Sequence, residues 1–74
     1  MNTAKYWTGD IGNCDICSIA LRKNGEFFDA RTYQGPWATI CQSCFTQHSP
    51  AKLGVGAGQH YQAMKDGRWM KVEG

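Results

Sequence analysis

Short apolar stretches alternate with polar residues along the chain, and glycine, proline or asparagine separates them. The segments 26–32 and 37–40 are expected to be β-strands because aromatic and β-branched side chains anchor them. The segment 42–49 is expected to be a short helix, which the following proline ends. The segments 59–64 and 68–72 are expected to be two further strands. The pattern therefore predicts a small α+β fold.

Two dipeptides predict the hairpin turns. The Asn-Gly pair at 24–25 and the Asp-Gly pair at 66–67 each combine residues that tolerate positive φ. A two-residue turn at the second pair would put Tyr61 and Val72 on the core face of the last hairpin. Trp69 would then lie on the opposite face, where we expect it to be exposed.

A chain of 74 residues forms one small domain at most. We expect residues 1–10 to be an N-terminal arm and residues 11–74 to be a single domain. No apolar run approaches the roughly 18 residues that a membrane span needs, and the N-terminus lacks the apolar segment of a secretory signal. We therefore expect a cytoplasmic protein with no membrane partner. A core of this size rarely supplies more than about 3–5 kcal/mol, so the fold needs a further constraint.

Four cysteines can supply that constraint. They form two C-x-x-C pairs, and 23 residues separate the pairs. A tetrahedral structural zinc site takes four thiolates, and two such turns can direct their sulfurs to one point. The sequence therefore predicts one structural zinc ion with the ligands Cys14, Cys17, Cys41 and Cys44.

Other uses of the four cysteines stay open. Two disulfides would need an oxidising compartment, and no export signal points to one. A thioredoxin-like redox site uses one C-x-x-C in a βαβ unit, which a chain of this length does not accommodate. An iron–sulfur cluster also takes four cysteine ligands. We prefer zinc because paired C-x-x-C turns are typical of structural zinc sites.

Signs of catalysis are scarce. Four protein ligands would leave no open position on the metal for water or substrate. The glycine run at 54–58 lacks the long helix and the lysine of a nucleotide-binding loop. A nuclease built around a zinc site of this kind would need a histidine just before the helix. The segment 37–40 contains none, and the two histidines of the chain are His48 and His60. We expect these two to have surface or packing roles, and we expect no enzyme and no small-molecule substrate.

The charge balance bears on the choice of partner. Lysine and arginine number 8 against 6 aspartates and glutamates, which gives a formal net charge of +2. Four thiolates and one Zn²⁺ add −2, so the metal-bound chain is close to neutral. Nonspecific nucleic-acid binding relies on excess positive charge. The balance therefore favours a protein partner.

The order of a cysteine knuckle, a hairpin and a cysteine pair at a helix start resembles a treble-clef zinc finger. Ser18 stands where such knuckles often carry glycine. About residues 14–72 are also similar to small uncharacterised four-cysteine proteins that phages commonly encode. The segments that carry this second resemblance are 28–32, 35–38 and 53–61, with the second cysteine pair. The resemblances imply a treble-clef-like finger with an added C-terminal hairpin, and a viral setting.

Aromatic and basic surface residues are the best candidates for partner contacts, because aromatic and arginine side chains dominate binding hot spots. Our candidates are Trp69, Tyr33, Arg22 and Lys23. Trp37 leads directly into the second cysteine pair and is expected to be structural instead. We therefore expect a noncatalytic zinc-binding interaction module that acts on a host or viral protein. DNA or RNA binding is the alternative, by analogy with other treble-clef fingers.

Overall fold

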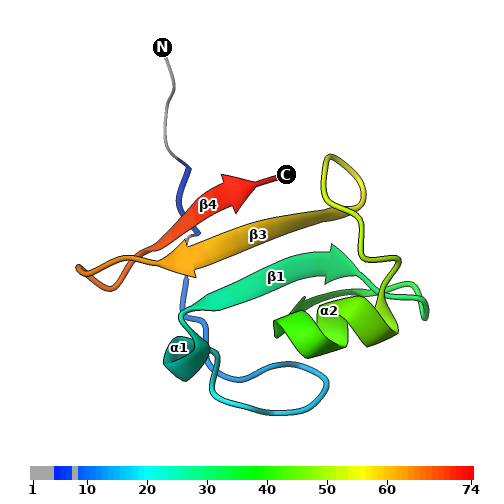
Figure 1. The fold of residues 1–74 in the computed structure, drawn as a ribbon, viewed down its shortest axis with the longest axis horizontal. Helices are drawn as coiled ribbons and strands as arrows, with labels where there is room; N and C mark the ends of the chain where they lie inside the picture. Colours follow the sequence, from blue (N-terminus) through cyan, green and yellow to red (C-terminus); the bar gives the residue numbers. More distant parts are fainter. Residues whose placement is uncertain (1–4, 8) are drawn as a thin grey trace.

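A four-stranded antiparallel sheet with the strand order β2-β1-β3-β4 forms the centre of the molecule (Figure 1). The computed structural model describes residues 5–7 and 9–74. Neither helix within these residues is long and apolar enough to cross a membrane. The small α+β class that the sequence predicts is confirmed. In chain order the elements are α1 (Leu21–Asn24), β1 (Glu26–Arg31), β2 (Trp37–Ile40), α2 (Gln42–His48), β3 (Gly58–Ala63) and β4 (Trp69–Glu73).

The four strands and α2 form within one residue of the predicted boundaries. β1 places Phe27 and Phe28 on opposite faces of the sheet, and both rings are buried. At the end of α2 the hydroxyl of Ser49 donates a hydrogen bond of 2.6 Å to the Phe45 carbonyl. One of the last helical carbonyls thus has a partner where the chain leaves the helix.

One face of the sheet, which we call the arm face, holds a cluster of aromatic rings. The rings of Phe27 and Tyr61 stack with centroids 5.0 Å apart, and the Trp69 ring meets Phe27 edge-on at 5.0 Å. Trp7 packs edge-on against both Phe27 and Tyr61. Aromatic pairs in these geometries add about 0.5–1.5 kcal/mol each beyond the burial of their area. This cluster is therefore a major part of the core.

The N-terminal segment 5–7 runs beside β4 (Figure 1). The backbone N–H of Trp7 donates a hydrogen bond of 2.9 Å to the carbonyl of Trp69. This contact fixes the Trp7 ring over the arm face. Residues 1–4 and 8 of the predicted arm lie outside the described residues, and the division into an arm and a domain stays a prediction.

The opposite face, which we call the helix face, carries α2 (Figure 1). The Phe28 ring stacks on Phe45 of α2 at 4.2 Å and on His60 of β3 at 4.3 Å. Nε2 of His60 lies 2.7 Å from Oε1 of Glu26, so the imidazole is held by a carboxylate as well as by the stack. His60 is therefore a packing residue, one of the two roles that the sequence allows for it.

The Asn-Gly pair at 24–25 does not form the predicted hairpin turn. Leu21–Asn24 make one helical turn, α1, and Gly25 ends it in the left-handed region with φ 72°. The Gly25 N–H donates to the carbonyls of Leu21 and Arg22. Glycine is favoured at a helix C-terminus for the same positive φ that favours it in a hairpin turn. The dipeptide alone could not distinguish the two structures.

The last hairpin pairs one residue away from the predicted register, and the expectation that Trp69 is exposed was wrong. The loop has three residues, 65–67, and the Met64 N–H closes it with a hydrogen bond of 2.7 Å to the Arg68 carbonyl. Its last residue is a glycine with φ 92°, as in a type I turn followed by a bulge. Trp69 therefore pairs with Ala63 and is only 2% exposed. A slip of one residue exchanges the two faces of a strand.

Trp37 also differs from its prediction, because it is 45% exposed. It begins β2, an edge strand, and its cross-strand partner Arg31 is exposed as well. The aromatic cluster of the arm face contacts Phe27, near the other end of β1. Nothing in that cluster reaches Trp37.

The two tryptophans give a test of the register. We expect Trp69→Ala to lower the free energy of unfolding of the metal-loaded protein by about 3–5 kcal/mol, since it empties the buried cluster. Trp37→Ala should cost less than about 1 kcal/mol, because the ring is half exposed. Urea midpoints at fixed metal concentration measure both changes. Equal losses, or a larger loss for Trp37→Ala, would contradict the observed register.

Candidate metal centre

Four cysteine sulfurs converge on one point. The Sγ atoms of Cys14, Cys17, Cys41 and Cys44 all lie within 4.8 Å of one another. Sulfurs at the corners of a zinc tetrahedron with Zn–S near 2.3 Å are roughly 3.8 Å apart, and Sγ of Cys17 lies 3.6 Å from Sγ of Cys41. All four cysteines are free thiols rather than disulfides. The cluster is close enough to coordinate one metal ion, as the sequence predicts.

The first cysteine pair lies in a tight turn, residues 13–20, which we call the knuckle. Asn13 and Ala20 form an isolated β-bridge at its base. Within the turn the backbone N–H groups of Ile16 and Cys17 each lie 3.4 Å from Sγ of Cys14 and donate to it. These hydrogen bonds orient the first sulfur and spread its negative charge.

The second pair lies at the start of α2. Cys41 is the N-cap residue, and Cys44 follows in the first helical turn. The N–H of Cys41 donates to Sγ of Cys14 at 3.5 Å. The amino end of a helix favours negative charge, which suits two thiolates. The first sulfur thus accepts hydrogen bonds from both halves of the site.

Asp15 ties the knuckle to β2. Its Oδ2 accepts hydrogen bonds from the N–H of Thr39 at 2.9 Å and from the Thr39 hydroxyl at 3.2 Å, and its own N–H donates to the Thr39 carbonyl at 3.0 Å. These groups are available because β2 is an edge strand. Asp15 lies inside the first pair and Thr39 stands two residues before the second, so the three bonds set the distance between the pairs. Sequence reasoning missed this link.

The protonation chemistry of the cluster favours a cation. Burial acts to raise the pKa of Cys14, but the three backbone N–H groups at its Sγ outweigh burial and lower the pKa to about 6. Burial, together with neighbouring sulfurs, raises the pKa of Cys41 and of Cys44. Four crowded sulfurs therefore resist carrying four negative charges on their own. A shared metal ion removes that penalty.

Ser18 follows the second knuckle cysteine with a positive φ of 69°. The left-handed region costs a residue with a Cβ roughly 1–2 kcal/mol, whereas glycine enters it freely. The knuckle keeps this geometry because the Ser18 N–H donates a hydrogen bond of 2.9 Å to the Cys14 carbonyl. Glycine at this position would adopt the same geometry without that cost.

The four candidate partner residues do not share one surface. Trp69 is buried, and the Arg22 guanidinium lies 4.6 Å from its ring centroid. Arg22 also donates to the Gly67 carbonyl at 3.1 Å. Trp69 and Arg22 therefore make contacts within the fold and are not free to anchor a partner. Lys23 is exposed beside them on α1, whereas Tyr33 lies beyond the far end of β1 and is 70% exposed.

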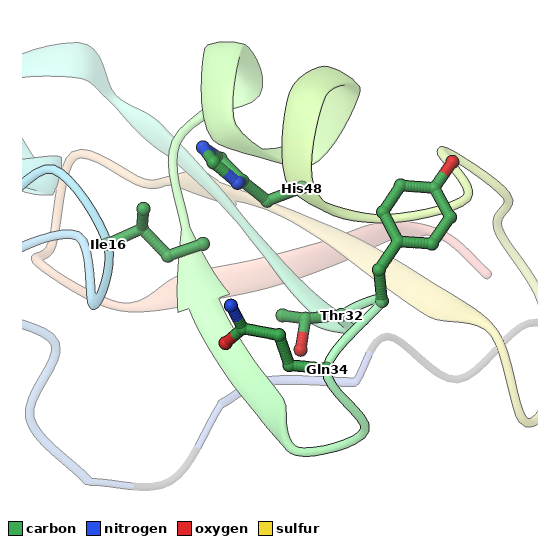
Figure 2. A pocket seen from close by; sticks show the side chains of 5 residues that line it. Ile16, Thr32, Gln34 and His48 are labelled. Atoms are coloured by element: carbon green, nitrogen blue, oxygen red, sulfur yellow. The ribbon is translucent and has the colours of Figure 1, made fainter.

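Beside the metal centre lies a pocket of about 170 Å³ that the sequence did not predict. Figure 2 shows Ile16 entering it from the knuckle, Thr32 and Gln34 from the β1–β2 turn, and His48 from α2. Tyr33 completes the lining. The Tyr33 N–H donates a hydrogen bond of 2.9 Å to the His48 carbonyl, which holds the turn against the end of the helix.

Ser18 offers a test of the knuckle geometry. We expect Ser18→Gly to stabilise the metal-loaded protein by about 0.5–1 kcal/mol, because glycine relieves the positive φ but loses more entropy on folding. Ser43→Gly is the matched control, since Ser43 is exposed within α2 and glycine there should cost about 0.5 kcal/mol. Thermal melting at fixed metal concentration compares the two. Destabilisation by Ser18→Gly would contradict the left-handed geometry.

Comparison with known proteins adds no relative from which a function can be read. No family model matches the chain, and searches of curated proteins and of solved structures also give no match. The functional argument therefore rests on the cluster and its surroundings.

Proposed function

We propose that the four cysteines bind one structural zinc ion and that the protein is a noncatalytic interaction module. The observation that carries the proposal is the convergence of four free sulfurs within 4.8 Å. Sulfur-only tetrahedral sites are typical of zinc, and four protein ligands leave no position for a substrate. The order of knuckle, β1–β2 hairpin and α2 supports placing the site in the treble-clef class. Free thiols suit a reducing compartment such as the cytoplasm.

The proposed partner is a host or viral protein, in line with the resemblance to phage-encoded proteins. Exposed apolar side chains in the knuckle and in the β1–β2 hairpin support this choice. Ile16 and Ile19 in the knuckle are 40% and 42% exposed, and Tyr33 and Trp37 of the β1–β2 hairpin are 70% and 45% exposed. Contiguous groups of exposed apolar side chains are typical of interaction sites.

Nucleic acid is the second candidate, and one feature of the structure supports it. The hydrogen bond from Arg22 to Gly67 brings α1 beside the β3–β4 loop. Four basic side chains lie on these two segments: Arg22, Lys23, Lys65 and Arg68, with Asp66 among them. However, the two arginines lie over aromatic rings, Arg22 over Trp69 and Arg68 over Tyr6.

Metal analysis tests the main proposal. We expect one zinc per chain, and we expect chelation or Cys41→Ser to collapse the amide dispersion of the NMR spectrum. Structural zinc is worth an apparent ~10–16 kcal/mol at neutral pH, which exceeds the stability expected of a core this small. Ser43→Ala, which changes a neighbouring residue of α2 that is no ligand, should keep both zinc and dispersion. A metal-free protein with cysteines oxidised in pairs would contradict the proposal.

Salt titration separates the two partner classes. We expect weak or undetectable binding of random-sequence duplex DNA at physiological salt, because the zinc-bound chain is near neutral. Each phosphate neutralised contributes about −0.9 to the slope of log K against log salt. Submicromolar binding with a slope steeper than about −3 would instead establish the nucleic-acid function. Fluorescence anisotropy over a salt series gives both quantities.

A further inference from the structure

The pocket between the knuckle and the β1–β2 turn has the size of a site for one side chain. Its volume is about 170 Å³. Sites for whole small molecules usually measure about 300–1,000 Å³. The pocket therefore suits one extended side chain of a larger partner and not a free nucleotide or cofactor.

The walls offer apolar contact and a flat aromatic ring. Ile16 is 40% exposed on the knuckle side (Figure 2). Tyr33, in the β1–β2 turn, is 70% exposed. The Thr32 hydroxyl is already engaged with the Pro36 carbonyl at 2.9 Å. In the part of the chain that the structure describes, no hydrogen bond uses the side-chain polar groups of Tyr33, Gln34 or His48. These groups are available to an incoming side chain.

Two sources of negative formal charge adjoin Ile16 of the pocket once zinc is bound. Four thiolates and one Zn²⁺ carry −2 in total, and Cys17 of that cluster is exposed. Asp15, the neighbour of Ile16, adds a further −1 and is also exposed. No lysine or arginine lines the pocket. Arg31 is near in sequence, but it pairs with Trp37 and shares the arm face with Phe27, whereas α2 covers the other face.

We propose that this pocket binds the arginine side chain of a basic segment in a partner protein. The proposal rests on the proposed zinc module and names the chemistry of its partner. The aliphatic stem of arginine would pack against Ile16, and the guanidinium would lie over the Tyr33 ring with the Gln34 amide oxygen as an acceptor. Guanidinium groups stack on aromatic faces more readily than ammonium groups do, and they are more weakly hydrated. The negative charge of the metal centre and of Asp15 attracts the cation.

The same charges argue against an anionic occupant. A phosphate or an acidic peptide at this position would face the cluster and Asp15, which carry the same sign of charge. Like charges brought together at a binding site suppress wrong partners. The basic end of the molecule, at α1 and the β3–β4 loop, lies at the other end of β1 from the pocket (Figure 1).

Capped pentapeptides with a single variable central residue test the proposal on the zinc-loaded protein. The probes carry arginine, lysine, norleucine or glutamate between two glycines on each side, and amide NMR shifts follow each titration. We expect the arginine peptide to shift Ile16, Tyr33, Gln34 and His48 with a Kd on the order of 1 mM. The lysine peptide should bind about 2- to 5-fold more weakly. The norleucine and glutamate peptides should bind at least about 10-fold more weakly.

Variants separate the pocket from the fold. Tyr33→Leu keeps an apolar wall but removes the aromatic face, so it should weaken the arginine peptide by about 2- to 5-fold. Asp15→Asn should weaken it about 2-fold, and raising the salt should do the same, because the attraction is partly electrostatic. Val55→Ser is the control, since Val55 is 97% exposed and does not line the pocket. Zinc content and amide dispersion are measured for every variant.

Several outcomes would overturn the proposal. The first is norleucine or glutamate binding as tightly as arginine. The second is a set of shifts that lies outside the pocket, and the third is an affinity that Tyr33→Leu leaves unchanged in the folded, zinc-loaded protein. A ten-residue thymidine oligonucleotide that shifts the same amides at lower concentration would assign the pocket to nucleic acid. A zinc-loaded protein that ignores the arginine peptide refutes this inference alone, whereas a protein without zinc refutes the proposed function as well.

Discussion

The structure depends above all on the convergence of sulfurs from two distant parts of the chain. Cys14 and Cys41 stand on either side of the β1–β2 hairpin, yet the Cys41 N–H donates to Sγ of Cys14 at 3.5 Å. For this contact to form, the hairpin must return the chain to the knuckle, and α2 must begin at that point. The helix then lies on one face of the sheet, where Phe45 meets Phe28. The geometry of the knuckle, the return of the hairpin and the packing of α2 on the sheet must therefore all be compatible with the convergence of the sulfurs.

The Asp15–Thr39 contact gives the two halves of the site a link that does not use sulfur. Three hydrogen bonds join the knuckle to the edge strand β2. They also place Ile16 next to the β1–β2 turn, which makes one wall of the pocket. The turn itself is held to the end of α2 by the bond from Tyr33 to the His48 carbonyl. The Asp15–Thr39 contact thus shapes the pocket as well as the metal centre.

A chain that is nearly neutral when zinc is bound can still have two differently charged ends. With zinc bound, the four cysteines and Asp15 would concentrate negative charge beside the pocket. Basic side chains gather at α1 and the β3–β4 loop because Arg22 bonds to Gly67. Local fields of this kind guide partners even when the total charge is small. The net charge read from the composition therefore describes neither end of the molecule.

The sequence by itself determined the ligands and most of the elements. The spacing of the cysteines identified all four sulfurs of the cluster, and the strands and α2 follow from aromatic anchors and from a proline stop, because these signals act over only a few residues. The tertiary structure decided the rest. A hairpin loop of three residues instead of two turned Trp69 into the core, and the edge position of β2 left Trp37 exposed. A pattern with a period of two residues shows that a strand has two faces, but it does not show which of them is covered. The loop geometry and the neighbouring strands decide that, and they also create the pocket, whose walls come from three segments that the sequence keeps apart.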